Sequence, residues 1–191
     1  MELLEQRILT DGKVLPGDVL KVNGFLNHRI DVKFVCKLGK EFYRIFADCG
    51  VNKLLTIESS GIGVACLTAQ FFDAPVVFAK KEKTSNISSD VWSAHAKSYT
   101  HKNEYDAVVS KEFLKKGDKV LIVDDFLARG EALEAMISLC EQAGAEIVGC
   151  GIVIEKKYQG GGDKLRARGV RVESLAMISS MTDDGKIEFF R

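Results

Sequence analysis

The hydrophobic positions along the chain alternate between two periods, one typical of buried strands and one typical of helices. Uninterrupted apolar runs such as LLTI at 54–57 and VVFA at 76–79 predict strands that are covered on both faces. Before and between them, apolar residues recur every three or four positions, which predicts one helix over 31–48, with Asp31 as a candidate N-cap, and another over 64–73. Such alternation favours a parallel sheet with helices on both faces.

The second half of the chain repeats this alternation. The segment KVLIVDD predicts a strand, ALEAMISLCEQAG a helix that Gly144 closes, and EIVGCGIVIE another strand. Farther on, RVESLAMI and KIEFF predict strands that extend the sheet, and GGGDKLRARG, which precedes them, predicts a turn and short helix. The predicted fold class is therefore α/β, a doubly wound and mainly parallel sheet. Residues 1–28 do not fit the alternation and are expected to form a small N-terminal lobe.

The segment 80–104 interrupts the pattern. It is rich in Ser, Thr, Asn, Lys and His and has weak periodicity, which suggests an exposed, mobile excursion or a hairpin whose returning strand is 105–109. The chain has only two prolines and contains no internal repeat and no low-complexity linker. We therefore expect one domain over residues 1–191.

Composition narrows the classes of function. Lys+Arg and Asp+Glu both number 27, so no overall field attracts the protein to nucleic acid or to an anionic membrane. The first residues, MELLEQRILTDG, lack the pattern of a secretory signal, and no apolar run approaches the length that spans a membrane. The five cysteines form no CxxC pair, which favours reduced thiols in a cytoplasmic protein.

The candidate chemistry lies in VLIVDDFLARGEA, residues 120–132. Asp124 and Asp125 follow a buried apolar run, where carboxylates need hydrogen-bond donors nearby. The start of a helix after them offers free backbone N–H groups to a phosphate. Carboxylates that can accept from hydroxyl groups, next to backbone amides that can bind a phosphate, indicate a sugar phosphate as the ligand. Two other interpretations stay open, an ordinary strand end with a helix cap and a nucleotide-binding turn, although neither GxGxxG nor GxxxxGK[ST] is present.

This segment resembles the signature of the type I phosphoribosyltransferases, and the resemblance covers the whole chain. The N-terminal lobe, the ESSGIG loop at 58–63, the polar excursion and IEKKYQGGG follow in matching order. The resemblance implies that family's fold, with a hood lobe over 1–28 that recognises the base and a flexible catalytic loop over 80–104. It also implies purine salvage, with phosphoribose transferred from phosphoribosyl diphosphate to N9 of xanthine and pyrophosphate released.

The same resemblance implies the donor-binding residues. The two acids Asp124 and Asp125 are expected to hold the ribose hydroxyls. The 5′-phosphate is expected to be wrapped by Ala128, Arg129, Gly130, Glu131 and Ala132. The diphosphate is expected to meet Ser59, Ser60 and Gly61, together with a lysine at the start of the loop, Lys81 among Lys80, Lys81 and Lys83. A tight turn and a solvated charge run are the ordinary alternatives for the last two groups.

For the base, the resemblance points to Leu20, Asn27 and Lys156, and Phe126 can either pack on the purine or belong to the core. Arg129 stands where many relatives have threonine, and Ala128 stands where the hypoxanthine-guanine branch has an aspartate that accepts the purine proton. No proton acceptor is therefore assigned, and the base can react as its anion.

The implied cofactor is Mg²⁺, bound mainly through the donor's diphosphate, because no local His, Asp and Glu cluster forms a protein metal site. A homodimer is also implied, and neither nucleic acid nor a membrane is an expected partner. Two alternatives remain: a purine-operon regulator that senses the donor with the same fold, and a transferase for guanine or hypoxanthine.

Overall fold

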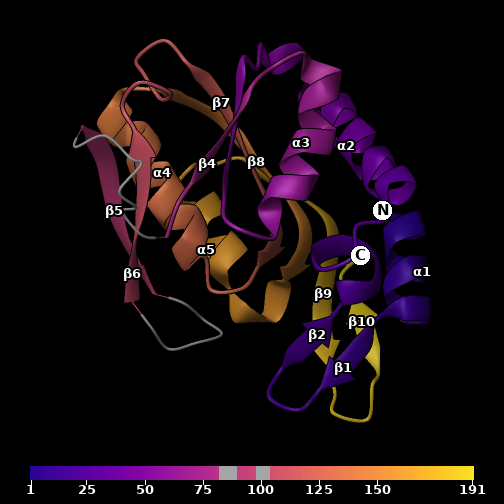
Figure 1. Ribbon diagram of the computed structural model, residues 1–191. Helices are drawn as coiled ribbons and strands as arrows, with labels where there is room; N and C mark the ends of the chain where they lie inside the picture. The colour runs from indigo at the N-terminus through magenta and orange to yellow at the C-terminus, as the bar shows by residue number, and fades with distance from the viewer. Residues whose placement is uncertain (82–89, 98–103) are drawn as a thin grey trace.

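A six-stranded sheet forms the centre of the protein. The computed structural model describes residues 1–81, 90–97 and 104–191 (Figure 1). Across the sheet the strands run in the order β10 (Ile187–Phe189), β9 (Val172–Met181), β8 (Glu146–Lys156), β7 (Lys119–Leu127), β3 (Lys53–Ile57) and β4 (Val76–Ala79). Neighbouring strands are parallel except for β10, which pairs antiparallel with β9 across a short turn. The mainly parallel α/β sheet predicted from the sequence is confirmed.

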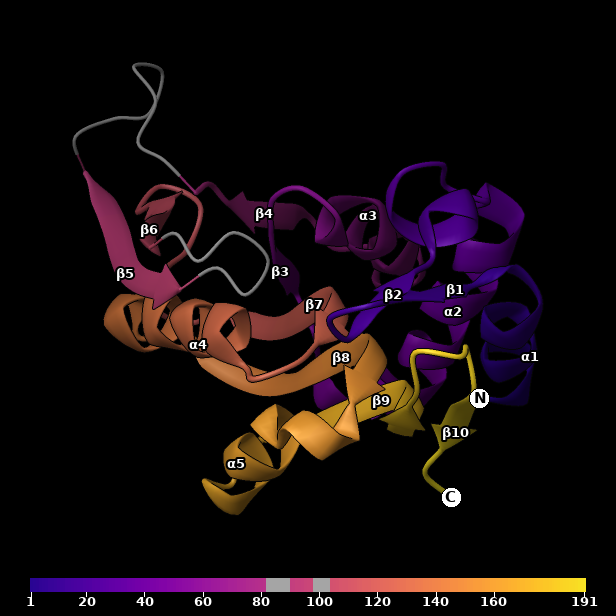
Figure 2. The same ribbon diagram turned by 90° about the horizontal axis from the view of Figure 1, so that it is seen from below.

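Helices cover both faces of the sheet, and the side chains of β7 show why. Leu121 and Val123 belong to a core cluster with α2 (Val32–Phe46) and α3 (Gly61–Phe72). Val120 and Ile122 point the other way, into a cluster with α4 (Glu131–Ala143) and α5 (Gly161–Ala167). This arrangement follows from the alternation of side chains along a strand, and Figure 2 shows α3 and α4 on opposite sides of the sheet.

The predicted helix boundaries hold where capping chemistry is visible in the sequence. The carboxylate of Asp31 accepts a hydrogen bond from the amide of Phe34 at 3.1 Å and so caps α2, and the short η2 (Ala47–Cys49) extends its end. Gly144, with φ of 67°, ends α4 in the left-handed conformation that favours glycine. None of the helices in the described ranges is long and apolar enough to cross a membrane.

The first 28 residues, which we call the hood, comprise α1 (Glu2–Asp11), the hairpin β1 (Lys13–Leu15) and β2 (Val19–Lys21), and the π-helical turn η1 (Asn23–Asn27). Leu4, Ile8 and Phe25 are fully buried in the same cluster as β9 residues such as Leu175. The hood therefore sits against β9 and β10 at one end of the sheet (Figure 1).

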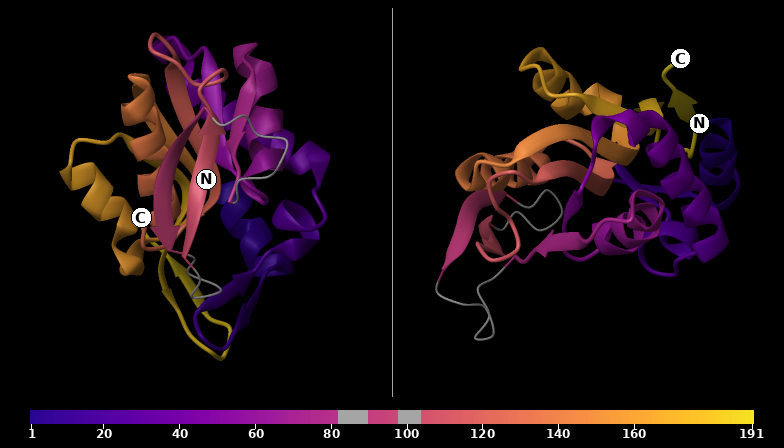
Figure 3. Two further views of the ribbon diagram at one scale, coloured as in Figure 1. Left: turned by 60° about the vertical axis from the view of Figure 1, so that its left-hand side comes forward. Right: turned by 90° about the horizontal axis from the view of Figure 1, so that it is seen from above.

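A second hairpin, β5 (Val91–Lys97) with β6 (Glu104–Ser110), follows β4 and packs beside α4 (Figure 3). A bridge between Lys80 and Val108 ties it to the end of β4. The strand expected over 105–109 is confirmed as β6. Much of the excursion predicted over 80–104, including Lys83, lies outside the described residues.

Candidate functional site

The acid pair lies within β7 and not at its end, which corrects the sequence interpretation. The strand continues to Leu127 because Phe126 and Leu127 still pair with β8. Asp124 and Asp125 are both buried, with 6% and 5% of their surfaces exposed. Their environments differ, however. Asp124 Oδ1 accepts the backbone N–H of Asp125 at 2.9 Å, whereas Asp125 lines a cavity.

Two side chains from distant segments donate to Asp125. Ser60 Oγ donates to Oδ1 at 3.0 Å, and Asn27 Nδ2 donates to Oδ2 at 3.1 Å. Ser60 is the N-cap residue of α3, but its hydroxyl makes no capping hydrogen bond to that helix. The expectation that donors surround the acids is therefore confirmed. Asn27, which we expected to contact the base, therefore also contacts Asp125.

Asp124 is held in a poor environment for a charge. Burial raises the pKa of Asp124 well above its ordinary value, and the charge of Asp125 raises it further. Gly61 packs over it so closely that an added Cβ would lie 2.9 Å from Asp124 Oδ1 and 2.2 Å from Thr56 Oγ1. Glycine is therefore required at position 61 for packing, whatever its role toward a ligand.

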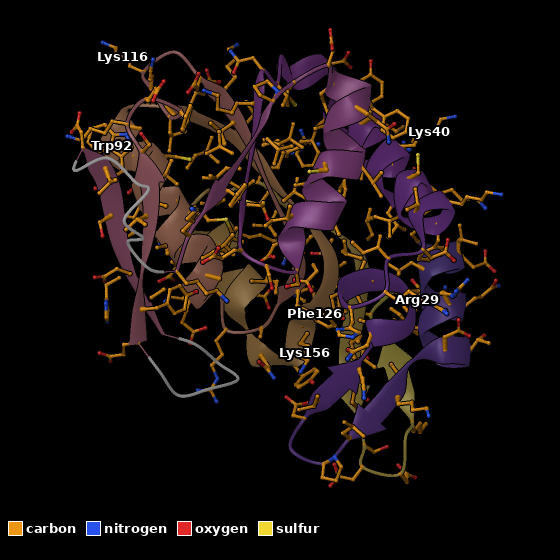
Figure 4. The ribbon with its side chains drawn as sticks, in the orientation of Figure 1. Arg29, Lys40, Trp92, Lys116, Phe126 and Lys156 are labelled. Carbon is orange, nitrogen blue, oxygen red and sulfur yellow. The ribbon has the colours of Figure 1, made fainter. Side chains whose placement is uncertain are left out.

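A cavity of about 500 Å³ lies between the hood and the carboxyl ends of β7 and β8. All four residues expected at the base, Leu20, Asn27, Phe126 and Lys156, line it. So do seven of those expected at the donor, Asp125, Ala128, Gly130, Glu131, Ala132, Ser60 and Lys81. Asp124, Ser59, Gly61 and the exposed Arg129 are absent from the wall. Figure 4 shows Phe126 and Lys156 close to the hood hairpin, far from Lys116 and Trp92.

The loop between β7 and α4 is shaped by glycines. The helix begins at Glu131, one residue before the predicted segment, and Gly130 precedes it in the left-handed conformation with φ of 95°. Gly161 supports this loop from α5, since its N–H donates to the carbonyl of Ala128 at 3.2 Å. A Cβ on Gly161 would lie 2.4 Å from the Ala128 oxygen. The sequence interpretation missed this support, although the run of three glycines at 160–162 signalled a close approach of backbones.

Lys156, at the end of β8, is buried and faces the hood. Its ammonium donates to the backbone carbonyl of Asp18, and Nζ lies 4.0 Å from Asp18 Oδ2. Burial lowers the pKa of Lys156, while the charge of Asp18 raises it. Asp18 was not predicted to belong to the site. Its side chain contacts residues about 140 positions away in the sequence, which no local pattern shows.

Lys81 and Tyr105 form the wall nearest the β5–β6 hairpin. The Lys81 amide donates to Glu58 Oε1 at 2.7 Å, and its ammonium lies 5.2 Å from the centre of the Tyr105 ring. Burial raises the pKa of Tyr105, and the charges of Asp124 and Glu131 raise it further. Tyr105 lines the cavity, yet the sequence interpretation gave it only a place in a strand.

No group of three or more His, Cys, Asp or Glu side chains within the described residues is arranged to hold a metal ion. The carboxylates on the cavity wall come from Asp18, Asp125 and Glu131. The five cysteines are free thiols, and burial raises the pKa of Cys140 and Cys150 to about 12.

Comparisons with known proteins agree with this geometry. A family model described as a phosphoribosyl transferase domain matches residues 38–175. A xanthine phosphoribosyltransferase of Lachnoclostridium phytofermentans is 51% identical over 190 residues, which cover 99% of this chain and 98% of that protein. Xanthine phosphoribosyltransferase 1 of Clostridium perfringens is 52% identical, with 99% and 100% covered.

Solved structures of adenine phosphoribosyltransferases share the fold. The Rhodothermus marinus protein superposes with a TM-score of 0.75 at 25% identity, over 92% of this chain and 98% of that chain. The Trypanosoma brucei protein, in complex with AMP, pyrophosphate and ribose-5-phosphate, gives a TM-score of 0.78 at 18% identity, over 95% and 82%.

Proposed function

Since the chain belongs to the phosphoribosyl transferase family, we propose that it transfers phosphoribose from phosphoribosyl diphosphate to N9 of xanthine and releases pyrophosphate. One observation carries the proposal: a single cavity is lined both by residues of the donor signature and by the residues that we expect to contact the base. A single cavity lets the two substrates meet without leaving the protein.

The donor half of the proposed site is built by β7 and the start of α4. Asp125 is the member of the acid pair that lines the cavity, so we assign it the first contact to a ribose hydroxyl. Asp124, which lies behind the wall, is assigned the other hydroxyl. The amides of 128–132 are proposed to bind the 5′-phosphate at the start of α4, where the helix dipole favours an anion. Ser59, Ser60, Gly61 and Lys81 are proposed to receive the diphosphate.

The base half is built by the hood and β8. Asn27 and Lys156 can donate hydrogen bonds to exocyclic oxygens, which xanthine carries at two positions. Phe126 is half-buried beside them and offers a ring to the purine face, and Leu20 closes the cavity from the hood. The hood and the ends of β7 and β8 enclose the cavity in part, which reduces the access of water to the anomeric carbon, where positive charge develops as pyrophosphate leaves.

Mg²⁺ fits this cavity as a companion of the diphosphate. The described residues offer scattered carboxylates on the wall and no three-ligand cage, which suits an ion held mainly by substrate oxygens and water. When bound, the ion neutralises charge on the departing pyrophosphate. Asp125 and Glu131 are the protein oxygens we assign to it or to its waters.

The cellular setting is also proposed. The five free thiols fit the reducing cytoplasm, and the protein is proposed to act there as a homodimer. We call residues 128–130, between β7 and α4, the phosphate loop. Arg129 is exposed in this loop, where it can reach a phosphate or a neighbouring subunit. The relatives named as enzymes match along 98% to 100% of their own lengths, which favours an enzyme over a donor-sensing regulator.

A purine panel tests the proposed function. The protein is incubated with phosphoribosyl diphosphate, Mg²⁺ and, separately, xanthine, guanine, hypoxanthine, adenine and orotate, and pyrophosphate release is followed. We expect the highest kcat/KM with xanthine. Absence of release with xanthine, together with good turnover of adenine or orotate, contradicts the proposal. A reaction without base measures hydrolysis of the donor.

A further inference from the structure

The turn of the hood hairpin carries an aspartate that contacts the far end of β8. Asp18 follows Gly17 in the turn between β1 and β2, and it has φ of 65°. Asp18 and Asp73 are the two non-glycine residues with positive φ among those that the structure describes. Aspartate tolerates this backbone better than most residues do, because its short polar side chain can form local hydrogen bonds.

Residues 156–159 end β8 and form η3 (Lys157–Gln159), and three of these four residues donate hydrogen bonds to Asp18. The ammonium of Lys156 donates to its backbone carbonyl, the hydroxyl of Tyr158 to Oδ1, and the amide of Gln159 to Oδ2. These contacts join segments about 140 residues apart in the sequence. They close the hood onto the sheet at the side of the cavity where Lys156 lies.

We propose that Asp18 is a positioning residue for the purine: it holds the Lys156 ammonium in the cavity wall and fixes the distance between the hood and β8. This inference rests on the proposed function, because it concerns the base that Lys156 contacts. It adds a residue that the donor signature and the expected base contacts do not include.

The need for such a residue follows from burial. Only 7% of the Lys156 side chain is exposed, and an ammonium removed from water requires an opposite charge or several acceptors. Asp18 supplies both, through its carbonyl and through a carboxylate oxygen 4.0 Å away. Its carboxylate also accepts hydrogen bonds from Tyr158 and Gln159, which hold the negative charge against η3.

Asp18→Asn tests the inference, because asparagine keeps the shape and the left-handed backbone but removes the charge. We expect KM for xanthine to rise about tenfold, because the variant loses the negative charge 4.0 Å from the Lys156 ammonium and weakens the bonds from Tyr158 and Gln159 to that charge. The bond from Lys156 to the backbone carbonyl is retained. KM for phosphoribosyl diphosphate and kcat are expected to stay near wild type. Asp73→Asn is the matched control, since Asp73 also has positive φ (51°) but lies at the exposed end of α3, away from the cavity. It is expected to change neither KM.

Tyr158→Phe provides a second variant that removes a single donor to Asp18 and leaves the hairpin turn intact. We expect KM for xanthine to rise in the same direction by a smaller factor. Unchanged KM for xanthine in both variants overturns the inference, and so does an equal rise in both KM values, which indicates general loosening.

The wild-type purine panel separates this result from a failure of the proposed function. If xanthine is not a substrate of the wild type, the proposed function fails. The KM for the purine that the protein does use is then compared between the wild type and the Asp18→Asn variant. If the wild type turns over xanthine and Asp18→Asn matches it, only the role of Asp18 fails.

Discussion

Two adjacent residues of the same type have opposite chemical settings in this protein. Asp125 accepts from Asn27 and Ser60, while Asp124 is buried under Gly61. The sequence predicted that donors surround the pair, because buried carboxylates need them. It could not predict which donors these are, since Asn27 and Ser60 lie 98 and 65 residues away from Asp125. For the same reason, Asp18 and Tyr105 escaped prediction.

Replacement of Asp125 by asparagine tests the carboxylate on the cavity wall. We expect kcat/KM to fall about 100-fold, equivalent to ~3 kcal/mol, if the charge stabilises the transition state as other preorganised polar groups do. Circular dichroism should show an unchanged fold. Near-wild-type turnover by the folded variant contradicts the assigned role.

Asp124→Asn tests the buried partner through stability. The raised pKa of Asp124 means that the folded state binds the proton more tightly than the unfolded state does. The stability that protonated Asp124 contributes to the folded state is therefore fully present at low pH, and it is lost as the pH rises from about 4 toward the raised pKa.

Asparagine carries no ionisable proton, and its Oδ1 can still accept from the Asp125 amide. We expect the Tm of the variant to exceed that of the wild type by a margin that widens as the pH rises. Thermal melts across that pH range measure the margin, and a margin that narrows with rising pH contradicts this expectation.

At the scale of elements, the short helix α5 supports the cavity without lining it. Gly161 contacts the phosphate loop, and Gly162 packs so closely on Glu155 that a Cβ would lie 2.1 Å from its Oε1. Glu155, 1% exposed, bonds Arg166 at 2.8 and 2.6 Å and also accepts from Ser174. The helix is therefore fixed to β8 and β9 on one side and to the loop on the other.

Gly161→Ala is expected to move the phosphate loop, because the new Cβ meets backbone atoms that cannot swing away. We expect KM for phosphoribosyl diphosphate to rise about tenfold, the effect of a displacement that weakens a few amide contacts. KM for xanthine is expected to change less. Gly24→Ala, where nothing lies within 4 Å of the added Cβ, is the control. Equal donor KM values in both variants contradict the supporting role.

Arg166→Met is expected to lower the free energy of unfolding by about 3 kcal/mol, because it leaves the buried Glu155 carboxylate without its charge partner. Arg168→Met is the matched control. Arg168 lies 3.7 Å from Glu134 on a more exposed surface, where such pairs contribute about 0–1 kcal/mol. Urea unfolding of both variants gives the comparison, and similar losses argue against a special role for the buried pair.

Periodicity predicted most elements of the sheet and its helices because the central strands, such as β7 and β8, are buried on both faces. It failed at the end of β7, where polar Asp124 and Asp125 look like a strand end but keep pairing with β8. For the segment after β4 it offered a hairpin as one alternative and placed only the returning strand, β6; it gave no bounds for β5, which pairs with β6 in a separate two-stranded sheet.

At the scale of the whole molecule, the sequence resemblance supplied what periodicity could not. Local pattern left the acid segment open between a cap, a nucleotide turn and a sugar-phosphate site. The arrangement of the hood over β8 resolves which residues share a cavity, since Leu20, Asn27 and Lys156 converge only after the chain has folded. Such convergence depends on packing of Leu4 and Ile8 against β9, which a single local window cannot contain.

The position of the hood has a consequence for synthesis. Residues 1–28 leave the ribosome before β8 and β9 do, yet Leu4 and Ile8 pack with residues of β9, and Asp18 accepts hydrogen bonds from Lys156, Tyr158 and Gln159. The acid pair and the phosphate loop lie between the hood and residues 156–181 in the sequence, so they are synthesised after the hood and before the residues that the hood contacts. In a nascent chain that ends after the donor signature, Leu4 and Ile8 therefore lack their packing partners in β9 and stay exposed to solvent. The cavity matures only when β8 and β9 have emerged.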